Sequence, residues 1–175
     1  MAPAAGAAVT AIGQHTWSAA LLLGSGTILR EVIAAADLLE NDWGVAADIW
    51  SATSYKRLRT EAVAAQRWNM LHPAEAPRKS YVETVLENEK GPFVAVSDFM
   101  RTIPDQIAPW VPGGLFTLGT DGFGRSDTRP ALRRHFEVDA NHIAFSTLST
   151  LYREGTVKKK TITDAIRILE IDPEK

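Results

Sequence analysis

The sequence predicts an α/β fold, a three-layer α/β/α sandwich built around a mostly parallel sheet. Two observations favour this class: four short apolar runs have the character of buried strands, and helical patterns lie between consecutive runs. Continuous apolar runs suit strands that are covered on both faces. Regular alternation of strand and helix is typical of right-handed βαβ units. A length of 175 residues suits one domain.

Turn-forming residues bound the expected strands. The first run ends at Gly24-Ser25-Gly26, the third is entered through Gly91-Pro92, and Pro112-Gly113-Gly114 precedes the fourth. A weaker fifth strand, expected at an edge of the sheet, covers residues 8–12. The four stronger runs predict strands at residues 19–23, 46–50, 93–96 and 115–118.

Capping residues mark the expected helices between and after the strands. Ser80 and Glu83 form the pattern of a capping box, and Asp139 can cap a long helix that Gly155 ends. Pro104 is expected to limit or kink the helix in which it lies. Thr27 is expected to cap a helix that stops at Asn41 or Gly44, and Ser54 is expected to cap a shorter helix. The other expected helix starts are Asp98, Asp127 and Thr161.

Composition excludes several classes of function. The chain has no cysteine, so disulfides, thiolate nucleophiles and thiolate metal sites are absent. The net charge of -2 gives no indication of nucleic-acid binding, which usually requires a basic face. The short run Lys158–Lys160 is interpreted as solvated surface. No apolar run approaches the roughly 20 residues of a membrane span, and the first eight residues lack the pattern of a secretory signal. We expect a cytoplasmic protein without a nucleic-acid or membrane partner.

The glycine turn after the first strand is a candidate anion site. Backbone N–H groups at a helix N-terminus attract anions, and Ser25, Gly26 and Thr27 would supply them. The third glycine of the dinucleotide fingerprint is missing, because Arg30 and Glu31 occupy that region. The alternative is a tight strand-to-helix turn without a ligand.

A glycine-rich loop after the fourth strand is a candidate interface. It lies where parallel sheets usually place function, at the carboxyl end of a strand. Its aromatic residue has few local neighbours to cover it, which favours an interaction surface. The alternative is a structural loop closed by an internal pair between Asp121 and Arg125. The interface residues predicted here are Asp121, Phe123, Arg125 and Ser126.

The remaining residues offer no obvious chemistry. The four histidines lack the spacing of a common metal site, and we expect His135 to be a satisfied, inward-facing structural residue. Most of the five tryptophans are interpreted as packing residues, whereas Trp68 and Trp110 are candidates for a patch that another domain covers. We therefore predict no metal ligand and no catalytic residue in this chain.

Several stretches of sequence together resemble the last domain of homodimeric pyruvate dehydrogenase, the decarboxylating component of the bacterial pyruvate dehydrogenase complex. The Phe-Gly-x-Ser loop is also similar to the more distant transketolases. The matching stretches are Leu22–Glu31, Asp48–Ser54, Arg67–Pro73 with Pro77-Arg78, Leu118–Asp127, Leu132–Asp139 and Ile171–Lys175.

The resemblance implies a domain plan and a fold. It covers residues 18–175, which would form a transketolase C-terminal-like domain, and leaves residues 1–17 as a flexible leader or edge strand. It implies a five-stranded mixed sheet with one antiparallel edge strand. Pro104 departs from the family pattern, which puts the continuity of its helix in question.

The resemblance also implies a division of labour. In this family thiamine diphosphate and Mg²⁺ are held by the other domains, through a Gly-Asp-Gly motif that this chain lacks, since Asp121-Gly122 follows Thr120. The chain would bind no cofactor alone, would be inactive alone, and would carry no residue of the cofactor site. The parent enzyme would decarboxylate pyruvate oxidatively and transfer the acetyl group to a lipoyl group. The partners implied are the rest of the parent polypeptide, a dimer mate, and the lipoyl acyltransferase component.

Two other interpretations remain open at this stage. The chain could be a stand-alone anion- or nucleotide-binding module that uses the Gly24–Thr27 turn. It could also be one subunit of a split 2-oxoacid dehydrogenase, whose other chain supplies the missing domains.

Overall fold

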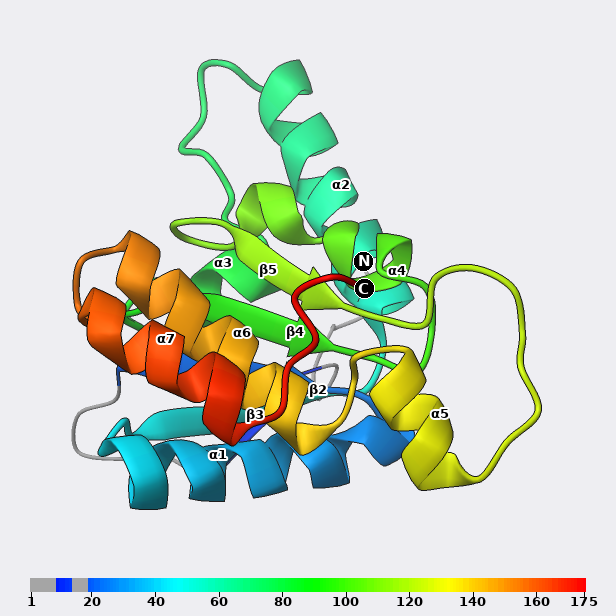
Figure 1. Ribbon diagram of the computed structural model, residues 1–175. Helices are drawn as coiled ribbons and strands as arrows, with labels where there is room; N and C mark the ends of the chain where they lie inside the picture. The colour runs from blue at the N-terminus through cyan, green and yellow to red at the C-terminus, as the bar shows by residue number, and fades with distance from the viewer. Residues whose placement is uncertain (1–8, 14–18) are drawn as a thin grey trace.

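The protein forms a twisted sheet between two groups of helices (Figure 1). The structure, a computed structural model, describes residues 9–13 and 19–175. The strand order is β1-β3-β2-β4-β5; β2 to β5 run parallel, and β1 pairs antiparallel with β3. The strands are β1 (Val9–Gly13), β2 (Ala20–Gly24), β3 (Ala47–Ala52), β4 (Phe93–Val96) and β5 (Leu115–Leu118).

Seven α-helices accompany these strands in the described part of the chain. A 3₁₀ turn, Gly26–Ile28, leads into α1, and a second one, Ala108–Trp110, precedes β5. The helices are α1 (Leu29–Trp43), α2 (Tyr55–Leu71), α3 (Tyr81–Leu86), α4 (Thr102–Asp105), α5 (Arg129–His135), α6 (Ala140–Arg153) and α7 (Lys159–Ile168).

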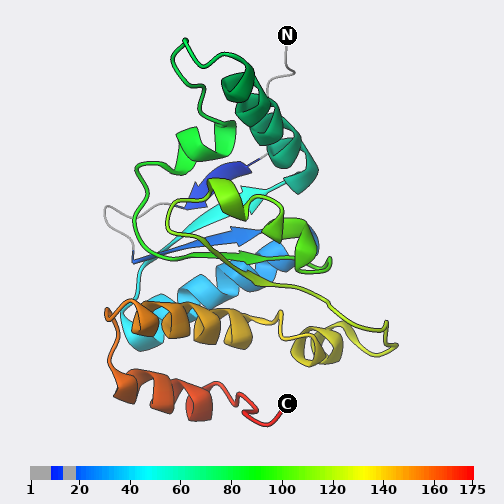
Figure 2. The same cartoon turned by 90° about the horizontal axis from the view of Figure 1, so that it is seen from above.

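The central strand β2 is buried on both faces, and its alternating side chains divide the core into two. Leu22 packs with residues of α1, α6 and α7, whereas Leu21 and Leu23 pack with residues of α2 and α3. Figure 2 shows α1 and α6 next to the sheet, with α7 farther out against α6. This arrangement confirms the predicted α/β class with helices on both sides of a parallel sheet.

Several predicted boundaries are confirmed at the level of single caps. Ser54 accepts a hydrogen bond from the Arg57 N–H at the start of α2. Ser80 and Glu83 form the reciprocal capping box of α3. Asp139 caps α6, and Gly44 ends α1 in the left-handed conformation, with φ of 64°.

Other predicted helix starts are wrong. Thr27 caps nothing, because the chain first makes the 3₁₀ turn and α1 begins at Leu29. Asp127 lies one residue before the true N-cap, Thr128, and α4 starts after Arg101 rather than Asp98. The last helix starts at Lys159 rather than after Thr161. The helix after Ser54 has 17 residues and is not short.

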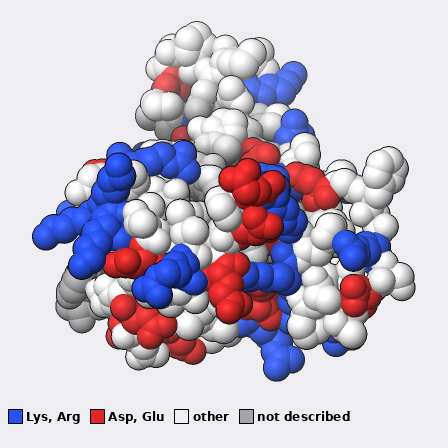
Figure 3. All heavy atoms as spheres, viewed as in Figure 1, with Lys and Arg blue, Asp and Glu red and all other residues white. Residues whose placement is uncertain are grey.

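The predicted leader is described only in part. Residues 9–13 form the edge strand β1, and residues 1–8 and 14–18, including Trp17 and His15, lie outside the described residues. Within the described residues no helix is both long and apolar enough to span a membrane. Basic and acidic side chains are interspersed on the face that Figure 3 shows.

Candidate functional site

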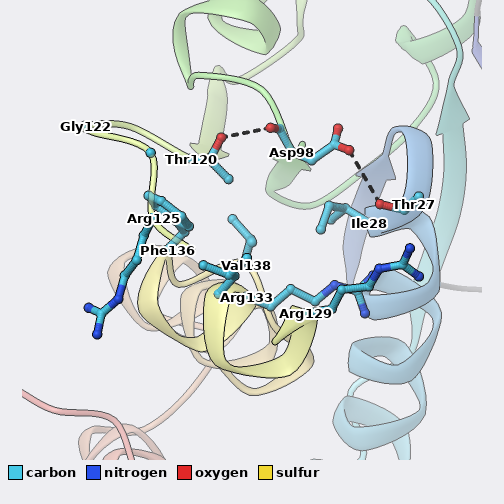
Figure 4. Close-up of a pocket in the computed structure, with 12 residues that line it drawn as sticks. Thr27, Ile28, Asp98, Thr120, Gly122, Arg125, Arg129, Arg133, Phe136 and Val138 are labelled. Carbon is cyan, nitrogen blue, oxygen red and sulfur yellow. Dashed lines mark hydrogen bonds between the residues drawn. The ribbon is translucent and has the colours of Figure 1, made fainter. Parts of the chain in front are cut away.

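A cavity opens at the carboxyl ends of β2, β4 and β5. The loops that follow these strands form part of its wall, and α5 closes the other side (Figure 4). Its volume is about 390 Å³. The lining residues are Thr27, Ile28, Asp98, Thr120, Gly122, Gly124, Arg125, Arg129, Leu132, Arg133, Phe136 and Val138.

The strand order explains why the cavity lies here. From β2 the chain passes through α1 to β3 on one side of it, and then crosses to β4 on the other side. The segments that follow β2 and β4 therefore diverge, since α1 covers one face of the sheet and α4 lies toward the other. A crevice at such a switch point is the usual ligand site of open parallel sheets.

Hydrogen bonds fix the loops after β4 and β5 against each other. The Thr120 hydroxyl donates to the Asp98 carbonyl at 2.8 Å, and the Thr120 N–H donates to the Phe99 carbonyl at 2.9 Å. The backbones approach so closely at Gly119 that a Cβ there would lie 2.5 Å from the Phe99 carbonyl oxygen. Only glycine fits this crossing without displacement of the neighbouring loop.

The predicted anion turn has a carboxylate beside it. Gly26 adopts φ of 57°, and a Cβ built on it would lie 3.3 Å from Oδ1 of Asp98. The Thr27 hydroxyl lies 3.5 Å from Oδ2 of the same side chain, and the buried Ser25 hydroxyl has no hydrogen-bond partner in the described residues. Because like charges repel, Asp98 disfavours an anion at this turn.

The three arginines of the cavity wall differ in their hydrogen-bond and ion-pair partners. Arg133 forms a half-buried ion pair with Glu31 of α1, with 2.6 Å between Nη1 and Oε1. Arg125 extends away from the cavity in Figure 4, and its Nη1 lies 3.3 Å from Nδ1 of His135. Arg129 makes no hydrogen bond or ion pair with the described residues, so its guanidinium group is available.

The predicted interface loop is exposed from Asp121 through Ser126. The Phe123 side chain is 98% exposed. The pair of Asp121 with Arg125, which belongs to the alternative of a closed structural loop, does not form. Asp121 instead accepts two hydrogen bonds from Arg101, from its backbone N–H at 3.0 Å and from Nε at 2.8 Å, because the loop after β4 lies closer to it.

Two of the described histidines, His135 and His142, differ in burial. His135 is exposed and contacts Phe136 edge-on, so the expectation of an inward-facing His135 is wrong. His142 is buried, and its Nδ1 lies 2.6 Å from Oδ1 of the N-cap Asp139. Burial acts to raise the pKa of Asp139, but the hydrogen bonds from His142 outweigh it and lower that pKa.

The two tryptophans singled out in the sequence are both partly buried. Trp68 lies between the stacked ring of His72, 4.4 Å away, and the guanidinium group of Arg78, 3.7 Å from its ring centre. Trp110 packs against the core beneath α2 and α3. Neither arrangement tests whether another domain covers these residues.

The sequence predicts part of the cavity wall, because Thr27 of the glycine turn and Arg125 of the glycine-rich loop both line it. It predicts Asp98 only as a helix cap, and it does not single out Arg129. The position of Asp98 is a usable signal, because this residue closely follows a predicted parallel strand. In the parts of the chain that the structure covers, no three His, Asp or Glu side chains form a group that could hold a metal ion.

The fold and the loop at this edge define a class of domain. The family model of the transketolase-like C-terminal domain matches residues 7–139, and the chain therefore belongs to this family. The pyruvate dehydrogenase E1 component of Pseudomonas aeruginosa is 49% identical over 155 residues, which are 88% of this chain and 18% of that protein. The E1 component of Escherichia coli K12 is 45% identical, over 88% of this chain and 17% of that protein.

Solved structures show the same fold at low sequence identity. The transketolase of Leishmania mexicana matches 88% of this chain and 20% of its own, with a TM-score of 0.58 and 16% identity. The transketolase of Campylobacter jejuni matches 81% of this chain and 18% of its own, with a TM-score of 0.57 and 17% identity. The chain thus spans less than a fifth of the length of the curated relatives given above.

Proposed function

We propose that this chain serves as the C-terminal structural and assembly domain of a pyruvate dehydrogenase E1 component. The observation that carries the proposal is the 49% identity to such a component over 88% of this chain, which corresponds to 18% of that protein. The parent enzyme would decarboxylate pyruvate oxidatively and pass the acetyl group to a lipoyl group. It would work in the cytoplasm.

In this proposal the cofactor chemistry lies outside the chain. Thiamine diphosphate supplies the carbanion chemistry of the parent reaction, and it needs a divalent cation to hold its diphosphate. The described residues do not fit this group: they offer no cluster of carboxylates or imidazoles for the cation, and Asp98 places a negative charge at the glycine turn predicted as an anion site. The proposed role of the chain is therefore structural: it packs against the rest of the parent enzyme and supports its assembly.

Exposed apolar side chains support a packing role. Phe99 and Met100 follow β4 and are 59% and 56% exposed, close to the loop that carries Phe123. Large apolar groups in water favour burial against a partner. The partner that we propose is the rest of the parent polypeptide or its dimer mate, and the lipoyl acyltransferase component is a further candidate.

A chimera tests the proposal most directly. In the Pseudomonas aeruginosa E1 component, the matching segment would be replaced by residues 18–175 of this chain. We expect the chimera to retain pyruvate decarboxylation with thiamine diphosphate, Mg²⁺ and an artificial electron acceptor, within about tenfold of the parent enzyme. The same enzyme truncated before this segment is the control and should be inactive. A folded chimera without turnover would contradict the assignment.

The isolated chain provides the complementary test. Assayed alone with pyruvate, thiamine diphosphate and Mg²⁺, it should give no turnover above buffer. Turnover by the isolated chain would overturn the division of labour. Co-purification of this chain with a second polypeptide that completes the activity would instead favour a split enzyme.

A further inference from the structure

The cavity at the switch point holds groups that the assembly role does not use. Its floor is apolar: Ile28 and Val138 are buried, and Leu132 and Phe136 are partly buried beside them. A volume of about 390 Å³ lies within the range of small-molecule sites. An apolar floor of this kind suits a planar or aliphatic body, because burial of apolar surface is favourable.

The charges of the wall favour one negative group at one end of the cavity. Arg133 is already paired with Glu31, and Arg125 is turned toward His135. Arg129 is exposed, lines the cavity, and has no partner among the residues that the structure describes. A guanidinium group can hold a phosphate or carboxylate through two parallel hydrogen bonds.

Asp98 is the negative group of the cavity wall. Its carboxylate lies beside Gly26 and Thr27, on the side formed by the turn after β2. Arg129 belongs to α5, and in Figure 4 its side chain extends from α5 toward the start of α1. An anionic group would therefore be repelled by Asp98 and attracted by the guanidinium group of Arg129.

We propose that this cavity binds a small ligand with an apolar body and one oxyanionic group, a phosphate ester or a carboxylate. Arg129 holds the oxyanion, and the floor of Ile28, Leu132, Phe136 and Val138 covers the body. The cavity shares Gly122, Gly124 and Arg125 with the predicted interface loop, but its apolar floor and Arg129 are distinct from the exposed side chains of Phe99 and Phe123.

Titrations of the 175-residue chain followed by two-dimensional NMR would test the site, with phenyl phosphate, benzoate, inorganic phosphate and benzyl alcohol as probes. We expect shifts of amides at residues 27–28, 120–125 and 129–138 with phenyl phosphate or benzoate. Phenyl phosphate should bind at least tenfold more tightly than inorganic phosphate, because only the ester covers the apolar floor. Benzyl alcohol, which lacks the anion, should bind more weakly than phenyl phosphate.

Two variants locate the anion. Arg129→Gln should weaken phenyl phosphate binding by about tenfold or more, the loss of one charge-assisted contact. Arg59→Gln, an exposed arginine of α2, is the matched control and should leave binding unchanged. Asp98→Asn should change the affinity by only a few-fold. The amide spectra of the variants, without ligand, establish that each one is folded.

Three outcomes would overturn the proposal. Equal binding of inorganic phosphate and phenyl phosphate would mean an adventitious anion only. Binding that Arg129→Gln leaves unchanged and Asp98→Asn strengthens more than tenfold would place the anion at the Ser25–Thr27 turn instead. Absence of shifts from every probe at concentrations of about 10 mM would mean that the cavity takes no such ligand. These readouts involve no pyruvate turnover, so their failure is distinct from failure of the chimera.

Discussion

Asp139 shows how one side chain can link a helix start to a buried histidine. Its Oδ1 accepts hydrogen bonds from the backbone N–H of His142 at 2.9 Å and contacts Nδ1 of the same residue at 2.6 Å. Its Oδ2 lies 3.4 Å from Nη1 of Arg134. These partners stabilise the charged carboxylate and lower the pKa of Asp139 against the opposing effect of burial.

We predict that Asp139→Asn lowers the free energy of unfolding by about 1 kcal/mol at pH 7, the difference between a charged and a neutral acceptor. A lowered pKa in the folded state stabilises the protein above the unfolded pKa, and this contribution is lost as the pH falls through the folded value. The gap between the variant and the parent should therefore close in acid. Urea unfolding at pH 7 and below pH 4 measures it, with Asp37→Asn as a control. A pH-independent gap would contradict this account.

Gly119 is the residue where two loops of the candidate site come closest. A Cβ there would lie 2.5 Å from the Phe99 carbonyl oxygen and 2.7 Å from the Arg101 nitrogen. Gly119→Ala should therefore destabilise the chain by roughly 1–3 kcal/mol, because backbone atoms must move. Gly124→Ala, with open space around it and no positive φ, is the matched control and should be close to neutral. Equal unfolding midpoints for the two variants would argue against a close crossing.

At the scale of elements, the distal half of α2 extends beyond the body of the protein in both ribbon views (Figures 1 and 2). The returning segment is tied to it by Asn69, whose side chain donates to the Arg78 carbonyl at 2.9 Å and accepts from the Arg78 N–H at 2.8 Å. Trp68, stacked between His72 and Arg78, adds contact at the same place. This region also exposes Met70, by 73%, and Leu71.

Removal of this tie should loosen the segment without unfolding the domain. In Asn69→Ala we expect faster amide hydrogen exchange across residues 72–80, by about tenfold for a loss near 1.4 kcal/mol, and unchanged exchange in β2 and β4. Gln66→Ala, exposed on the same helix, is the control. Uniform acceleration across the sheet would show that the tie supports the whole fold instead.

At the scale of the whole molecule, two regions each expose several large apolar side chains. One comprises Phe99, Met100 and Phe123 at the carboxyl edge, and the other lies on the distal half of α2. Both regions fit a domain whose exposed apolar side chains pack against the rest of a larger enzyme. Because these side chains are exposed in the isolated chain, their substitution should affect assembly of the proposed parent more than the stability of the chain.

Phe123→Ser tests this separation. In the isolated chain the substitution should change the free energy of unfolding by less than about 0.5 kcal/mol, because the ring is 98% exposed. In the chimera with the Pseudomonas aeruginosa relative it should lower either the thermal midpoint or the pyruvate turnover several-fold. Tyr152→Ser, an exposed aromatic on α6, is the control. A chimera that Phe123→Ser leaves unaffected would remove the loop from the proposed interface.

The amino-acid sequence determined the features that depend on local chemistry. Strands 93–96 and 115–118 match the structure, the capping box at Ser80 formed, and the cap at Asp139 formed, because apolar runs and short hydrogen-bonded caps are set by neighbouring residues. Helix starts were wrong at Thr27 and Asp127, where a 3₁₀ turn or one further residue of loop intervened.

The tertiary structure alone decided which distant residues meet. Asp121 pairs with Arg101 rather than Arg125, Asp98 lies beside Gly26, and Arg129 faces a cavity shared by three loops. These contacts join residues that are 20 or more positions apart, or loops of different strands, and depend on the strand order. Sequence periodicity specifies which face of each element is buried, but the pairing of strands places the loops, and therefore the site.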